Sequence, residues 1–79
     1  MENKTFMASD AIENRKKFYL NYNSTRLNII LERIEEYSKK GRDSIEIDDI
    51  RLDMNEFDAL RVRGFLVDST AVMIFIKWI

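Results

Sequence analysis

The sequence of 79 residues contains no cysteine and no histidine. The absence of cysteine excludes disulfide bonds, and the absence of both residue types excludes the common zinc ligand sets. A chain of this length buries only about 60% of its unfolded surface, so its fold is marginal unless a disulfide, a metal or an assembly supports it. Association with further copies is the source of added stability that this composition still allows, and we therefore expect a homo-oligomer.

The sequence also has no excess of charge of one sign: 13 Lys and Arg stand against 14 Asp and Glu, for a net charge of −1. Proteins that bind nucleic acid usually carry surplus cations that neutralise phosphates, so the composition disfavours a nucleic-acid partner. No charged segment followed by an apolar run opens the chain, and no apolar run approaches the roughly 20 residues that span a bilayer. We expect a cytoplasmic protein without a membrane partner.

Proline is absent, and the two glycines, Gly41 and Gly64, each follow a helix-like segment. Glycine is enriched just past the ends of helices. From Ser9 onward, the apolar side chains fall on one stripe of a helical wheel. This pattern predicts one long helix over residues 9–40. Two helices joined near Asn23 are the alternative, because the polar residues around it have weak helix propensity.

The rest of the chain predicts a small sheet with one short helix. Residues 44–48 alternate as a strand does, and residues 65–68 and 71–78 predict a β-hairpin around a short polar turn. Asp53 and Glu56 have the spacing of a capping box, which predicts a helix over residues 53–63. We therefore predict an α+β fold, a single domain over residues 1–79 in the order α-β-α-β-β, with a three-stranded sheet.

More apolar surface is encoded than this fold can cover. A helix over residues 9–40 would be about 45–50 Å long, and the residues after Gly41 are too few to cover it. A second apolar line on that helix has the spacing of a short coiled-coil seam, and the last strand is apolar on both faces, as strands covered on both sides are. We predict a self-association surface formed by Ala11, Phe18, Tyr22, Ile29, Met73 and Phe75. The simpler alternative is that Phe18 and Tyr22 only widen the core stripe.

The sequence lacks the side chains for enzymatic chemistry. Without His or Cys, a nucleophile would need Ser or Thr activated by Lys or a carboxylate, and each serine stands where a cap, turn or polar face explains it. The acidic residues 46–53 lack the ligand pattern of a calcium loop, and there is no glycine-rich phosphate loop. We expect no enzyme, no metal and no cofactor.

Several motifs resemble a pattern found in small uncharacterised proteins of phages and prophages. The corresponding residues here are Ala11, Asn14-Arg15, Ile30-Leu31-Glu32-Arg33-Ile34, Lys40-Gly41, Ile45-Glu46-Ile47, Leu60-Arg61-Val62-Arg63-Gly64-Phe65-Leu66-Val67 and Ile76-Lys77-Trp78. The hairpin departs from the pattern, because Ser69-Thr70-Ala71 stands where Gly or Asn is usual. The resemblance implies a viral accessory or virion protein, in the host cytoplasm or in the virion, and it supplies no active site.

We therefore expect a non-catalytic, self-associating accessory protein that acts by binding. It would inhibit a host or defence protein, or sequester a small signal molecule. Arg26, Arg33 and Tyr37 are candidate residues for lining such a ligand, although the arginines at the edge of the core stripe are also placed to extend into solvent. A structural virion component is the alternative.

A winged-helix DNA-binding protein is a further alternative. Residues 54–63 would then form the helix that reads DNA, and residues 68–70 the wing. Only about six residues separate the first strand from that helix, which is too few for the extra helix of that fold, and the wing carries no Lys or Arg.

Overall fold

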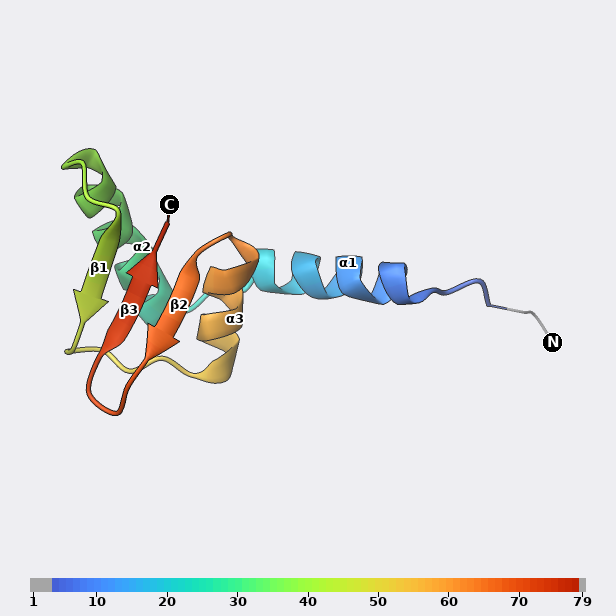
Figure 1. The fold of residues 1–79 in the computed structure, drawn as a ribbon. Coiled ribbons are helices and arrows are strands. Elements are labelled where there is room, and N and C mark those ends of the chain that lie inside the picture. Colours follow the sequence, from blue (N-terminus) through green and yellow to red (C-terminus); the bar gives the residue numbers. More distant parts are fainter. Residues whose placement is uncertain (1–3, 79) are drawn as a thin grey trace.

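The structure, a computed structural model, describes residues 4–78. Its elements are α1 (Ala8–Leu20), α2 (Thr25–Lys39), β1 (Ser44–Ile47), α3 (Met54–Val62), β2 (Leu66–Ser69) and β3 (Ile74–Lys77). The three strands form one antiparallel sheet in the order β1-β3-β2 (Figure 1). The predicted α+β fold with a three-stranded sheet is therefore confirmed, with two helices at its start in place of one.

The predicted long helix over residues 9–40 is wrong, because the chain leaves the helical path between Leu20 and Thr25. Ser24 has an extended backbone, and its Oγ accepts a hydrogen bond of 3.1 Å from the Leu27 N–H, so that it caps α2. The Asn21 side chain donates to the Lys17 carbonyl at the end of α1. Short polar side chains that bond to the backbone favour helix ends over helix interiors. The alternative of two helices near Asn23 is the one that the chain adopts.

Both ends of α3 follow from local sequence signals. The capping box of α3 is confirmed: the Glu56 N–H donates to Asp53 Oδ1 at 2.8 Å, and the Asp53 N–H donates to Glu56 Oε1 at 2.9 Å. Gly64 ends the same helix with φ of +95°, the left-handed region that favours glycine. Its N–H donates to the Arg61 carbonyl while the Phe65 N–H donates to the Leu60 carbonyl, which is the Schellman arrangement.

One face of the sheet holds the core. In the register of the strands, Ile45 pairs with Ile76 and Ile47 with Ile74, and these four side chains are buried against α2 and α3, which lie on that face (Figure 1). The buried apolar residues of the core are Leu27, Ile30, Ile34, Ile45, Ile47, Ala59, Leu60, Ile74 and Ile76. All of them lie after the break, so α1 is an addition to a body formed by residues 24–78.

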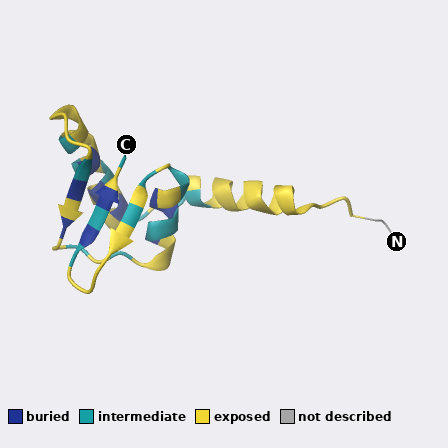
Figure 2. Ribbon diagram, in the orientation of Figure 1, coloured by how far each residue is buried: buried dark blue, intermediate teal, exposed yellow. Residues whose placement is uncertain are grey.

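Helix α1 projects from this body and gives the molecule its elongated shape. The described residues extend over 56 × 26 × 20 Å, and Figure 1 shows α1 pointing away from the sheet toward the N-terminus. Figure 2 shows that α1 is exposed along almost its whole length. We expected the residues after Gly41 to be too few to cover the N-terminal half of the predicted helix. The exposure of α1 agrees with this expectation.

Candidate functional site

The surface of α1 carries several exposed apolar side chains. The helix contributes no buried side chain within residues 4–78. Ile12 and Phe18 are each 60% exposed, and Leu20 is 50% exposed. An isolated helix of about 12–15 residues is marginal in water, and most helical stability in proteins comes from packing of an apolar face. The 13 residues of α1 therefore lack the packing that usually stabilises a helix of this length.

Arg63 anchors the C-terminal end of α1 to the body. Its Nη1 donates to the Tyr19 carbonyl at 3.0 Å, and its Nη2 donates to the Leu20 carbonyl at 2.9 Å. The last carbonyls of a helix have no partner inside the helix, so a guanidinium that binds two of them caps α1 from outside. Because Nη1 also donates to the Ala59 carbonyl of α3 at 2.6 Å, one side chain joins the two helices.

Two further contacts fix the direction in which α1 projects. Arg15 forms an ion pair of 3.3 Å with Asp58 of α3, and its guanidinium lies 4.9 Å from the centre of the Tyr19 ring. The Tyr19 hydroxyl donates to Asn55 Oδ1 at 3.3 Å. The side of α1 that carries Arg15 and Tyr19 is thus occupied by α3 over its last turns, and the other sides are open.

A line of exposed residues runs along an open side of α1. Met7, the N-cap residue directly before α1, is followed by Ala11, Asn14 and Phe18 at spacings of four, three and four, which is the spacing of a coiled-coil seam. We call these four residues the α1 seam. At about 100° per residue, the seam lies roughly a quarter-turn around the helix from Arg15 and Tyr19. An open hollow flanks its C-terminal end, lined by Asn14, Lys17, Phe18, Asn21, Tyr22 and Asn23.

The six residues predicted to mediate self-association lie in different places. Ala11 and Phe18 are exposed on the α1 seam, whereas Tyr22 is half-buried in the break and packs against the core. Ile29 belongs to α2, so the predicted line from Ala11 to Ile29 along one helix is interrupted by the break. Met73, just before β3, and Phe75, within β3, are half-buried. The structure therefore brings together only Ala11 and Phe18 on one line, and adds Met7 and Asn14 to them.

The outer face of the sheet carries a second apolar area. Phe75 lies between Glu46 and Asp68 in the strand register, and Leu66 of β2 is 62% exposed. The prediction that both faces of the last strand are covered is not met within residues 4–78, since α2 and α3 lie on one face and α1 points away (Figure 1). A hollow at this place is lined by Arg61, Gly64, Phe65, Leu66, Val67, Asp68, Phe75 and Lys77.

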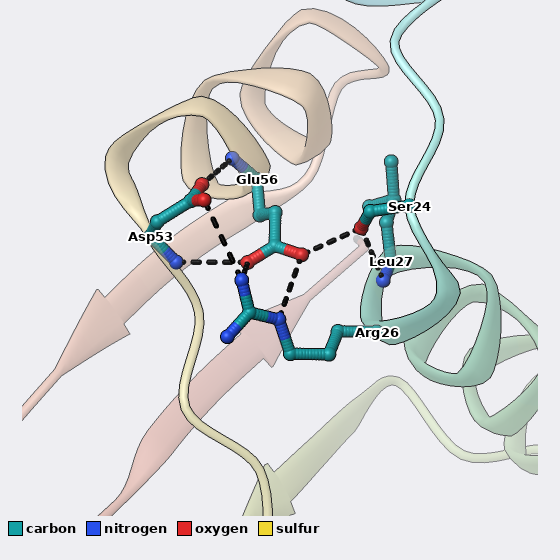
Figure 3. A network of polar contacts seen from close by, with 5 residues as sticks. All are labelled: Ser24, Arg26, Leu27, Asp53 and Glu56. Carbon is teal, nitrogen blue, oxygen red and sulfur yellow. Dashed lines mark hydrogen bonds and ion pairs between the residues drawn. The ribbon is translucent and has the colours of Figure 1, made fainter.

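The buried carboxylate of Glu56 is the centre of a polar network that joins α2 to α3 (Figure 3). It accepts hydrogen bonds from Ser24 Oγ at 2.5 Å and from Arg26 Nε at 3.1 Å, besides the Asp53 N–H. Buried charges are costly unless they are paired and hydrogen-bonded, and this one is both. Sequence reasoning identified Glu56 as part of a cap, but nothing in the sequence indicated its burial.

The three candidate ligand-lining residues lie along α2, and two of them are engaged in ion pairs. Arg26 is engaged with Glu56, and Arg33 donates two hydrogen bonds of 2.8 Å to Asp49. The Arg33 guanidinium lowers the pKa of the Asp49 carboxyl, and the same hydrogen bonds raise the pKa of Arg33. Tyr37 lies farther along α2 beside the cations of residues 40 and 42. A ligand-lining role for these residues therefore stays a prediction from the sequence alone.

Three other features were looked for in the described residues: a metal site, a membrane-spanning helix and a helix that reads DNA. Residues 4–78 bring no three His, Cys, Asp or Glu side chains together as a metal site would need, and their helices are too short or too polar to cross a bilayer. In a winged-helix protein, α3 would face DNA. Here Asn55 and Asp58 on that helix contact Tyr19 and Arg15 of α1, and the winged-helix alternative stays a prediction from the sequence.

Comparisons with known proteins give no match to this chain, whether they use family models, curated protein sequences or solved structures.

Proposed function

We propose that this chain is a non-catalytic protein that acts by binding, and that α1 is the element through which it self-associates. The observation that carries the proposal is an anchored helix without a buried side chain, whose Phe18 is 60% exposed. Burying a large apolar side chain contributes about 1.5–3 kcal/mol, so covering Phe18 alone is a substantial gain for a domain of this size. A second copy of the chain supplies such cover.

The anchoring of α1 supports a contact of defined geometry. Arg63, together with the ion pair between Arg15 and Asp58, holds the last turns of α1 against α3. A projecting element that is fixed at its base loses less conformational entropy on binding than a free segment does. The body, residues 24–78, is then presented at each end of the assembly, with the hollow around Leu66 and Phe75 free for another partner.

The setting in which this binding operates comes from the resemblance to phage and prophage proteins. In that setting the assembly is an accessory factor that blocks a host or defence protein by occupying part of its surface. A closed assembly of few copies fits this role, whereas an open polymer fits a structural virion component. An open polymer would therefore favour the virion component over the accessory factor.

Sedimentation velocity at micromolar concentrations tests the proposal. We expect the unmodified chain to sediment as a dimer or a small closed oligomer, and Phe18→Lys to sediment as a monomer with its sheet intact by circular dichroism. Val72→Lys is the matched control, because Val72 is 75% exposed but lies in the hairpin turn, away from α1. A monomeric unmodified chain overturns the proposal, and so does a Phe18→Lys variant with unchanged mass.

A further inference from the structure

We propose that α1 pairs with α1 of a second copy in the antiparallel direction, along the α1 seam. This inference rests on the proposed self-association and specifies its geometry. The occupant of the seam is a second copy of this chain, and the arguments for it are the distribution of charge along α1 and the order of side-chain sizes along the seam.

The charges of α1 are separated along its length. Asp10 and Glu13 lie in its first half, and Lys16 and Lys17 lie in its second half; all four are exposed. An antiparallel pair places the acidic half of each helix beside the basic half of the other, which is attractive. A parallel pair places the two acidic halves side by side and the two basic halves side by side, and the Arg15 that would face Asp10 across such a pair is already held by Asp58.

Asp10 and Lys17 have the positions that meet across an antiparallel seam. Each directly precedes a seam residue, Asp10 before Ala11 and Lys17 before Phe18, so both flank the same edge of the seam. Residues that flank a coiled-coil seam form the ion pairs that set the orientation of its helices. Because a two-fold contact repeats each interaction, Asp10 of each copy faces Lys17 of the other, giving two such pairs.

Side-chain size along the seam favours the same direction. The N-terminal part of the seam carries Met7 and Ala11, one flexible and one small, and its C-terminal end carries Phe18. In the antiparallel pair, Phe18 lies over the Met7–Ala11 part of the other copy, so that the large ring meets the small side chain. The Met7 side chain of that copy then reaches the hollow that Phe18 and Tyr22 flank. A parallel pair stacks Ala11 on Ala11 and leaves a gap there.

The seam and the anchor do not compete for the same side chains. Arg15 and Tyr19 face α3, and Arg63 holds the last carbonyls of α1, so pairing along the seam leaves these contacts in place. The body of each copy is attached at the C-terminal end of its α1. The antiparallel pair therefore carries the two bodies at opposite ends, where they do not collide.

Disulfide trapping tests the direction directly, because the chain has no cysteine of its own. Asp10→Cys and Lys17→Cys are prepared separately, mixed in equal amounts and oxidised mildly. We expect the mixed disulfide to be the main cross-linked product, and each variant alone to cross-link poorly. Ser9→Cys mixed with Lys16→Cys is the matched control: it has the same spacing of seven but lies on the side away from the seam, so we expect little cross-linking.

A charge-swap cycle gives an independent readout. Asp10→Lys and Lys17→Asp each bring like charges together and weaken the dimer, whereas the double variant restores opposite charges and associates more tightly than additivity predicts, on the order of tenfold for two exposed pairs. The hydrogen bond from the Met7 N–H to the Asp10 carboxylate is lost in both variants that change Asp10, so its loss cancels in the cycle.

The outcomes separate this inference from the proposed self-association. A dimer in which Asp10→Cys alone cross-links efficiently, or in which the double charge swap gives no recovery, overturns the antiparallel pairing and leaves self-association intact. A monomeric unmodified chain overturns both.

Discussion

The hydroxyl of Ser24 donates a hydrogen bond of 2.5 Å to the carboxylate of Glu56, and this contact ties the start of α2 to the start of α3 (Figure 3). Both residues also take part in helix capping: Ser24 is the N-cap of α2 and its Oγ accepts from the Leu27 N–H, and Glu56 accepts from the N–H of Asp53, the N-cap of α3. The ion pair of 3.0 Å from Arg26 balances the buried charge. The network therefore fixes how the two helices meet, and with it the point from which α1 leaves the body.

Replacing Glu56 with glutamine should destabilise the fold by about 1–3 kcal/mol. The amide keeps the shape of the side chain, but it removes the charge that faces Arg26 and turns one acceptor into a donor among groups that all donate. The effect should be large because Glu56 is fully buried. Urea unfolding followed by circular dichroism measures it. Glu32→Gln, at an exposed position on α2, is the control and should change stability by far less. Equal stability of the Glu56 and Glu32 variants would show that the network does not support the fold.

Replacing Arg63 with methionine should release α1 from the body while leaving the core folded. The variant keeps the apolar stem of the side chain. It loses the two hydrogen bonds that the charged guanidinium donates to the Tyr19 and Leu20 carbonyls at the end of α1. We expect the amide protons of α1 to exchange faster and the chain to be cleaved more readily between α1 and α2 in limited proteolysis. Protection of the β3 amides should change little. Arg51→Met, at an exposed position in the loop before α3, is the control. Unchanged exchange in α1 would contradict the anchoring role of Arg63.

The parts of the fold that depend on neighbouring residues were predictable from the sequence. Asp53 and Glu56 are three residues apart, and the Schellman turn at Gly64 involves only the last turn of α3 and the residues next to it. The alternation of Ile45 and Ile47 identified the first strand and its buried face for the same reason. Such signals are contained in a few consecutive residues, and they were enough for the α+β class, the three-stranded sheet and the later elements.

The break between α1 and α2 could not be predicted from neighbouring residues alone. The helical phase of the apolar side chains continues through residues 21–25, so periodicity alone favoured one helix. The break is stabilised by contacts across the chain: Ser24 with Glu56, 32 residues away, and Arg63 with the Tyr19 carbonyl, 44 residues away. The same is true of the candidate site, because the seam was assigned from a helix that included Ile29, and only the fold showed that α1 ends at Leu20.

The pair between Arg33 and Asp49 should make a small contribution to acid sensitivity. The hydrogen bonds from Arg33 lower the pKa of the Asp49 carboxyl below its value in the unfolded chain, so the pair stabilises the fold above that unfolded value. This contribution is lost as the pH falls through the lower pKa of the folded state. NMR titration of the Asp49 carboxyl should show the low pKa, and Arg33→Gln should return it toward the ordinary range. Both side chains are solvent-accessible, so high salt should weaken the effect. An Asp49 pKa that Arg33→Gln leaves unchanged would contradict this cause.

Replacing Gly64 with alanine should destabilise the fold by about 1 kcal/mol, through the backbone alone. The φ of +95° is unfavourable for a residue with a Cβ, yet a Cβ at this position would meet no atom within 4 Å, so no side-chain clash adds to the cost. Gly64→Asn should cost less, because asparagine tolerates the left-handed region better than alanine does. Gly41→Ala, at a φ of +78° and also in open space, should behave like Gly64→Ala. Thermal unfolding of the three variants measures the order. If Gly64→Ala were as stable as the unmodified chain, the turn that places Arg63 beside α1 would not depend on the left-handed conformation.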